Sequence, residues 1–145
     1  MKITILDNTD GSEDEVIVRC SVLDESLISL LNSFKHGKQK RTVYKDDRIF
    51  LIDDNDAFYF ESVDDRVFVY TASDVYETRS KLYQLENELP QKDFMRANKA
   101  VIINLNKIKS LAPAFGGRFE ATIENGYKVI ISRMYVPVLK ERLGL

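Results

Sequence analysis

Short apolar and β-branched segments separated by polar turns dominate the chain from Arg41 onward, a pattern typical of antiparallel strands. Before Pro90 these segments cover residues 42–45, 48–53, 57–62, 66–71 and 73–78. After Pro90 they cover residues 94–96, 101–104, 108–112, 119–123 and 127–131. The pattern predicts a mainly β fold that also contains helix, in the α+β class.

The first 40 residues are expected to form a small ββα lobe, with the rest of the chain, 41–145, as a second domain. Residues 2–6 and 15–20 predict two strands that could pair as a hairpin. Apolar residues then recur at helical spacing, which predicts a helix capped by Ser21 or Asp24 and stopped by Gly37. Its apolar stripe consists of Leu23, Leu27, Leu30, Leu31 and Phe34.

Two further helices are expected, one in each half of the second domain. Leucines at positions 82, 85 and 89 predict a short amphipathic helix introduced by Thr78 or Ser80 and ended by Pro90. A stripe at positions 136, 139 and 143 predicts the last helix. Because Pro137 has no amide hydrogen, it is tolerated only in the first turn, so this helix should begin near residue 135 or 136.

A hairpin is predicted around residues 124–126, Glu-Asn-Gly, because an Asn-Gly pair readily adopts the positive φ angles of two-residue connections. Pro113 and the glycine pair 116–117 should break the chain before this hairpin and form an exposed loop.

The composition is that of an ordinary globular protein, with 44% hydrophobic and 30% charged residues in 145. No apolar stretch approaches the roughly 20 residues that span a bilayer, and the N-terminus lacks the pattern of a signal peptide, so a cytoplasmic location is expected. Cys20 is the single cysteine, which excludes an internal disulfide. It is expected to be a small buried residue on a strand.

The charge is distributed unevenly along the chain. Residues 91–145 contain ten Lys or Arg and four Asp or Glu, a net charge of +6, whereas residues 1–90 contain 11 and 19, a net charge of −8. The total of −2 can therefore conceal one basic face that meets a phosphate backbone. Ordinary solvated surface charge explains the asymmetry equally well.

Catalysis and metal binding are poorly supported. The single histidine, His36, lies in a basic loop, and no glycine-rich phosphate-binding motif is present. The acidic segment 53–56 lacks the glycine of a calcium loop. We therefore predict neither an enzyme nor a cofactor, a metal or a small-molecule substrate.

The basic half supports binding to DNA instead. Arg96, Lys99, Lys128 and Arg133 are placed at the ends of short strands, where long cationic side chains can reach phosphates or guanine. Asn98 and Asn104 add amides that could read a base or cap a turn. For Asn104, at the end of an apolar run, satisfying backbone groups is the favoured role, and Arg133 could equally form an internal ion pair.

Residues 94–135 contain the most informative motif: Phe94-Met95-Arg96-Ala97-Asn98-Lys99-Ala100, an apolar run closed by Asn104, and later Ile130-Ile131-Ser132-Arg133-Met134-Tyr135. The motif resembles the recognition half of LytTR-type DNA-binding domains, and the resemblance covers roughly residues 41–143. It implies an elongated stack of small antiparallel sheets with short helices, whose loops enter two successive major grooves of DNA.

Mapped onto this chain, the resemblance places DNA contacts in three segments. They are the loop around Asp64, Asp65 and Arg66, the step from Asn98 to Lys99, and the turn from Ser132 through Arg133 and Met134 to Tyr135. Because a receiver domain is absent, the chain resembles the stand-alone subgroup of transcriptional regulators. The family often pairs such regulators with a membrane protein.

One domain of this size offers few base contacts, so we expect two copies to bind repeated half-sites spaced by about 10 base pairs or a multiple of it. The N-terminal lobe is a candidate for the contact between copies, although it could instead close the core. The competing hypothesis is a protein-interaction module that does not bind DNA.

Overall fold

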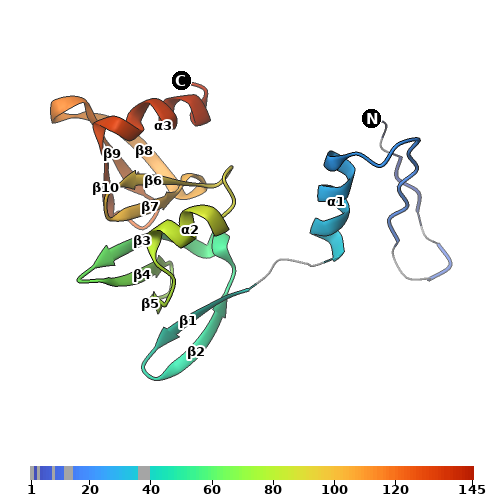
Figure 1. Cartoon of the computed structure of the whole chain (residues 1–145), viewed down its shortest axis with the longest axis horizontal. Coiled ribbons are helices and arrows are strands. Elements are labelled where there is room, and N and C mark those ends of the chain that lie inside the picture. Colours follow the sequence, from blue (N-terminus) through green and yellow to red (C-terminus); the bar gives the residue numbers. More distant parts are fainter. Residues whose placement is uncertain (1, 3, 8, 12–14, 36–39) are drawn as a thin grey trace. The chain divides into compact units, whose positions relative to one another are not determined.

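The computed structural model describes residues 2, 4–7, 9–11, 15–35 and 40–145. The chain divides into two compact units, Met1–Gly37 and Lys38–Leu145 (Figure 1). The predicted boundary at residues 40 and 41 lies close to this division. The two units are described separately.

Among its described residues, the N-terminal unit contains one helix, α1 (Glu25–Lys35), as its helical spacing predicted. Asp24 caps it, because the Asp24 carboxylate accepts a hydrogen bond of 2.9 Å from the backbone N–H of Leu27. The predicted stop at Gly37 lies outside the described residues.

The prediction of two strands in this unit is wrong. No described residue before Arg41 belongs to a strand, and Cys20 is exposed rather than buried on one. The run from residue 15 to 20 has strand-like residues, but a strand needs a paired neighbour and an isolated two-stranded hairpin is only marginally stable in water.

The second unit contains a seven-stranded antiparallel sheet in the order β2-β1-β5-β4-β3-β7-β6. Its strands are β1 (Arg41–Lys45), β2 (Arg48–Ile52), β3 (Ala57–Val63), β4 (Arg66–Thr71), β5 (Val75–Thr78), β6 (Phe94–Asn98) and β7 (Val101–Asn104). Each was predicted within a few residues of its observed bounds. The pairing of β3 with β7, far apart in the sequence, joins the two halves of this unit.

A smaller antiparallel sheet has the order β10-β9-β8, formed by β8 (Ile108–Ala114), β9 (Arg118–Ile123) and β10 (Lys128–Ile131). Pro113 does not break the chain as predicted, because it lies within β8, opposite Phe119. Proline is tolerated there because β8 is an edge strand, one of the places in a sheet where proline can lie.

The hairpin between β9 and β10 forms, but by a different turn from the one predicted. Gly126 has a φ of 89° whereas Asn125 is not among the residues with positive φ, and the backbone of Ile123 bonds to that of Tyr127. Three residues therefore make the connection, with glycine in the left-handed position, rather than an Asn-Gly pair alone.

Two helices complete the second unit. Helix α2 (Leu82–Glu88) buries Leu82 and Leu85, and α3 (Val136–Leu143) buries Val136 and Leu139 and has its proline in the first turn, as predicted. The predicted caps of α2, Thr78 or Ser80, are wrong. Lys81 occupies the cap position, and its N–H donates to the side-chain oxygen of Gln84 at 2.8 Å.

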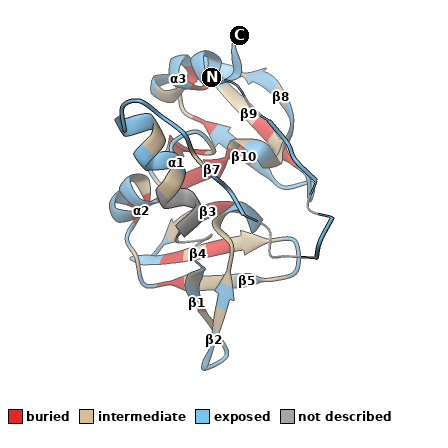
Figure 2. Ribbon diagram, turned by 90° about the vertical axis from the view of Figure 1, so that its right-hand side faces the viewer, coloured by how far each residue is buried: buried red, intermediate tan, exposed pale blue. Residues whose placement is uncertain are grey.

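Two hydrophobic cores lie within this unit. One packs α2 against the seven-stranded sheet around Phe60, Leu85 and Ile102. The other joins the seven-stranded sheet to the small sheet and α3, around Ile103, Ile131 and Leu139. Figure 2 shows the buried residues concentrated in the strands of both sheets. Because Ile102 and Ile103 are neighbours on β7, this strand supports both cores and fixes the turns at its ends.

Candidate nucleic-acid interface

Three turns predicted to contact DNA lie next to one another in the second unit. They are the β3–β4 turn at Asp64 and Asp65, the β6–β7 turn at Lys99 and Ala100, and the segment from Ser132 to Tyr135 between β10 and α3. In Figure 1 the β3–β4 hairpin, the β6–β7 turn and β10 lie on the same side of this unit.

Backbone hydrogen bonds connect these turns in series. The N–H of Ser62, at the end of β3, donates to the carbonyl oxygen of Ala100 at 2.8 Å. The N–H of Ser132 donates to the carbonyl oxygen of Ala97, also at 2.8 Å. The β6–β7 turn is therefore tied to β3 on one side and to the end of β10 on the other.

Asn98 fixes the conformation of the β6–β7 turn. Its side-chain Nδ2 donates to the carbonyl oxygen of Ile130 at 2.8 Å, and its Oδ1 accepts from the N–H of Ala100 at 2.9 Å. Both ends of this amide thus bind backbone within the protein. The geometry gives Asn98 a positioning role for the neighbouring Lys99, whatever contact with DNA it also makes.

Lys99 and Met134 are exposed, and the exposed fraction of Met134 is 74%. Neither Lys99 nor Arg133 forms an ion pair with any residue that the structure describes. The internal ion pair considered for Arg133 is therefore not present among those residues. These two cations remain open to solvent at the ends of β6 and β10.

Gly117 supports the position of Arg133. A methyl group at Gly117 would lie 3.1 Å from Cδ and 3.2 Å from Cγ of Arg133, so the arginine stem packs directly over the glycine. Gly117 also has a φ of 76°, in the left-handed region that favours glycine. The loop before β9 and the turn after β10 thus meet at this point.

Unlike Lys99, Arg66 is paired with a carboxylate. Its Nε and Nη2 donate to the two carboxylate oxygens of Glu77 at 2.9 and 2.5 Å, and this pairing lowers the pKa of Glu77. Asp64 and Asp65 next to it have φ values of 50° and 63°, the conformation of a tight two-residue hairpin turn. The first predicted contact loop therefore exposes two carboxylates beside a paired arginine.

Lys128 also has a carboxylate partner, Glu120, at 3.4 Å. It pairs in register with Thr122, whereas Ile131 at the other end of β10 pairs with Phe119. Lys128 therefore lies at the opposite end of the small sheet from Arg133, and the structure does not bring these two predicted residues together.

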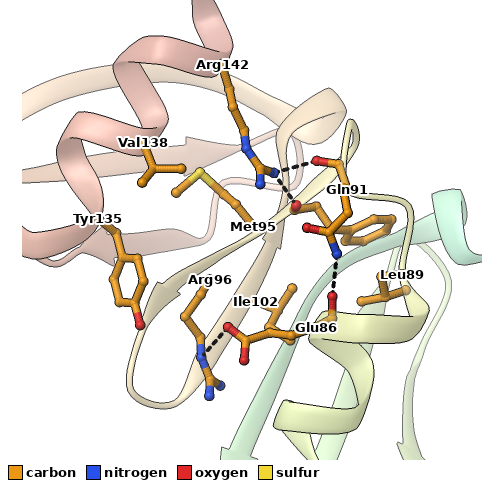
Figure 3. Close-up of a pocket in the computed structure, with 10 residues that line it drawn as sticks. Glu86, Leu89, Gln91, Met95, Arg96, Ile102, Tyr135, Val138 and Arg142 are labelled. Carbon is orange, nitrogen blue, oxygen red and sulfur yellow. Dashed lines mark hydrogen bonds and ion pairs between the residues drawn. The ribbon is translucent and has the colours of Figure 1, made fainter.

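Arg96 and Tyr135 are both partly buried. The Arg96 side chain is 18% exposed, and its Nε lies 3.3 Å from Oε1 of Glu86. Tyr135 is half-buried and packs against the core formed by β10 and α3. Both residues line a cavity, together with Glu86 and Arg142 (Figure 3).

Asn104 is fully buried and structural, as favoured from the sequence. Its Nδ2 donates to the carbonyl oxygen of Ala57 at 2.9 Å, and its Oδ1 accepts from the N–H of Asn106 at 3.0 Å. It connects β7 to the start of β3 and is not available to a base.

Three residues in or next to the loop before β9 were not predicted as part of this surface: Phe115, Gly117, which lies under Arg133, and Arg118. Phe115 is 92% exposed, and Arg118 begins β9 next to it. A signal was present, since β9 is antiparallel to β10 and its first residues must lie beside the last residues of β10.

The described residues were also compared with the requirements of a metal site and of a membrane helix. The described residues contain no group of three or more His, Cys, Asp or Glu side chains that could hold a metal ion. Within the described part of the chain, no helix is long and apolar enough to cross a membrane.

Comparison with known proteins shows the family to which this fold belongs. The family model of the LytTr DNA-binding domain matches residues 47–144. The chain is 36% identical to the sensory transduction protein LytT of Bacillus cereus, in a match that covers 84% of this chain and 57% of that protein. The chain thus spans little more than half the length of that relative.

Two further matches have different coverage. The chain is 25% identical to an HTH-type transcriptional regulator of Staphylococcus aureus, over 100% of this chain and 99% of that protein. The solved LytTr DNA-binding domain of a Bacillus cereus protein superimposes with a TM-score of 0.71 at 26% identity, and the match covers 75% of this chain and all of that domain.

Proposed function

The chain belongs to the LytTr DNA-binding domain family, and from this premise we propose that it is a transcriptional regulator that reads duplex DNA with turns rather than with a recognition helix. The family is one of DNA-binding regulators and not of enzymes. A relative matched along nearly its whole length is named a transcriptional regulator, which supports the same role here.

The series of hydrogen bonds that joins the three turns carries this proposal. Ser62 with Ala100, and Ala97 with Ser132, place the β6–β7 turn between the other two. Strand ends held in this way form a rigid edge, and contacts built on rigid elements are more precise than contacts on free loops. The helices α2 and α3 instead bury their apolar faces in the two cores.

Within this edge we assign the central DNA contacts to Lys99, Arg133 and Met134. The two cations have no ion-pair partner among the described residues and can approach phosphates or guanine, and Met134 can contact a thymine methyl group. Arg118 directly follows Gly117, which lies under Arg133, so we add it to the same surface. Arg66, Asn98, Lys128 and Tyr135 take secondary roles, because each is already engaged within the protein.

We further propose that the loops of one domain enter two successive major grooves, as the sequence resemblance implied, and that two copies bind repeated half-sites, because one domain offers few base contacts. Each good base contact discriminates against a wrong base by about 1–3 kcal/mol. Two copies make about twice as many contacts and would therefore roughly double the total discrimination. A cytoplasmic location, contact between copies through the N-terminal unit and pairing with a membrane protein belong to the same proposal.

Selection of DNA from a random duplex library by the purified full chain tests the function directly. We expect enrichment of a repeated motif, and footprinting of the selected site should show two protected half-sites at saturation. A single protected half-site, with one protein per duplex by sedimentation, would contradict the two-copy arrangement. No enrichment, with binding to a protein partner instead, would favour the interaction-module hypothesis.

A further inference from the structure

A cavity of about 170 Å³ lies between the end of α2, the strand β6 and the helix α3 (Figure 3). Exposed residues at its rim include Val138 and Arg142, so small molecules can enter from solvent. At about 30 Å³ for one water-sized group, the cavity has room for roughly six such groups. Its size suits a very small organic molecule.

The walls of the cavity divide into an apolar and a charged part. The apolar part consists of Leu89, Phe94, Met95, Ile102 and Val138. The charged part contains two arginines, Arg96 and Arg142, and one carboxylate, Glu86. The two positive charges exceed the one negative charge, which favours an anionic group in a partly apolar site.

Arg96 has unused hydrogen-bonding capacity at this site. Its Nε lies 3.3 Å from Glu86, but its Nη1 is buried and has no hydrogen-bond partner among the described residues. Nη1 lies on the guanidinium edge away from Nε–H, so Glu86 cannot serve both atoms in this arrangement. A buried donor without an acceptor is unfavourable and is rare in native proteins.

Arg142 is held in place by the backbone. Its Nη1 donates to the carbonyl oxygens of Gln91 and Phe94 at 2.6 and 2.5 Å. This arginine therefore contributes a fixed positive charge to the rim, and its Nη1 is already used. Arg96 is the residue that needs an additional acceptor.

We propose that this cavity binds a short-chain monocarboxylic acid of about six non-hydrogen atoms, whose carboxylate accepts from Arg96 and whose hydrocarbon chain contacts the apolar wall. Butyrate has this size. Because Nη1 is covered, the Arg96 side chain must rotate toward the cavity when the acid binds. The apolar wall favours such an acid over inorganic phosphate, which has no apolar part.

The position of the cavity couples it to the proposed DNA contacts, and this second part rests on the proposed function. Arg96 precedes Asn98 and Lys99 by two and three residues on the same strand and turn, and Tyr135 directly follows Met134. A bound acid that holds Arg96 also holds the end of β6, so it should strengthen DNA binding. By linkage, DNA must then strengthen acid binding by the same factor.

Direct titration of the full chain with sodium butyrate tests the site without DNA. Isothermal calorimetry gives the affinity, and the Arg96 Nε–H resonance in an NMR spectrum reports contact with the guanidinium. Butylamine, butan-1-ol and inorganic phosphate serve as ligands of matched size that change the charge or remove the hydrocarbon chain. We expect saturable binding of butyrate and little of the other three.

Two variants test the site independently. Arg96→Gln should weaken butyrate binding by about tenfold or more, the loss that corresponds to one hydrogen bond to a charged group. Val138→Phe should block the cavity while leaving every polar group in place, and it remains informative if Arg96→Gln fails to fold. Lys109→Gln, an exposed cation outside the cavity with the same change of charge, should bind butyrate as the parent does.

The results separate the two parts of the inference. No saturable butyrate binding, equal binding of phosphate, or unchanged butyrate binding by Val138→Phe would overturn the site. If butyrate binds, we expect DNA affinity to rise about fivefold or more in the parent and not in Val138→Phe. Butyrate binding with unchanged DNA affinity would overturn the regulatory part, and absence of all DNA binding would refute the proposed function alone.

Discussion

The β6–β7 turn and the β3–β4 turn are neighbours, and each carries a cation, yet the two cations are in opposite situations. Lys99 is exposed and forms no ion pair with a described residue, whereas Arg66 gives two hydrogen bonds to Glu77 and lies beside Asp64 and Asp65. A cation at the end of a strand is therefore not by itself available to a phosphate. Its partners within the fold decide whether it contributes to the field that DNA meets.

The same comparison applies to the two ends of the small sheet. Arg133, at the end of β10, has a stem packed over Gly117 and no ion-pair partner among the described residues. Lys128, at the start of β10, lies 3.4 Å from Glu120. Lys99 and Arg133, which have no ion-pair partner in the described part of the chain, thus lie on the side where the three turns meet, and this contrast can be tested by substitution.

The largest effect is expected for Arg133→Ala. If Arg133 reads a base, the affinity for a selected site should fall by about 1–3 kcal/mol, roughly 5–150-fold, with a smaller loss for random DNA. The free energy of unfolding should change by no more than about 0.5 kcal/mol, because the head group has no partner in the described fold. Titration of labelled duplexes and denaturant unfolding measure the two quantities.

Two matched variants sharpen this test. Arg133→Lys keeps the charge but loses the bidentate geometry, so it should retain random binding and lose selectivity. Gly117→Ala should displace the Arg133 stem and weaken selective binding while Arg133 itself is intact. A large fall in stability for Arg133→Ala would mean that the residue is structural.

An intermediate effect is expected for Lys99→Ala. Removal of one phosphate contact should reduce the slope of log affinity against log salt concentration by about 0.9 and weaken binding to all sequences alike. Lys128→Ala is the control, since Lys128 has the same charge but is paired with Glu120. Equal slopes for the two variants would remove the distinction between paired and unpaired lysines.

The smallest effect is expected for Arg66→Ala, with a change in DNA affinity below about threefold, because the contact is screened by Glu77 and by the acidic turn. Glu77→Gln should instead release Arg66 and strengthen binding in a salt-dependent manner.

The pKa of Glu77 is lowered by Arg66, so this carboxylate stays charged as pH falls until the lowered pKa is reached. Between about pH 6 and 8, far above the usual glutamate pKa of about 4.3, titration of Glu77 should therefore not alter DNA affinity. A large loss for Arg66→Ala would show that the salt bridge opens on DNA.

Sequence patterns predicted most of the second unit because its strands and helices follow local rules. Apolar segments of strand length became strands, and Leu82, Leu85 and Leu139 became the buried faces of helices. The same rules failed for residues 15–20, where no described residue forms a strand. Periodicity states which face can be buried, but it does not supply the partner that buries it.

The sequence predicted that turns with positive φ angles occur, but not always the residues that adopt them. The Asn-Gly pair at 125 and 126 was expected to adopt two positive φ angles, and only Gly126 does so. The paired positive φ angles occur instead at Asp46 with Asp47 and at Asp64 with Asp65. Aspartate tolerates this conformation better than most residues, but the strand register decides where it is required.

The sequence by itself determined the fold class, the positions of the strands from residue 41 onward and the three segments that carry the family motif, because these depend on local spacing and residue type. Only the tertiary structure decided which side chains are available. Ion pairs such as Arg66 with Glu77 and Arg96 with Glu86 join different elements, and their formation depends on which strands and helices become neighbours. The same long-range packing placed Gly117 under Arg133 and enclosed the cavity beside Arg96, which no local pattern encodes.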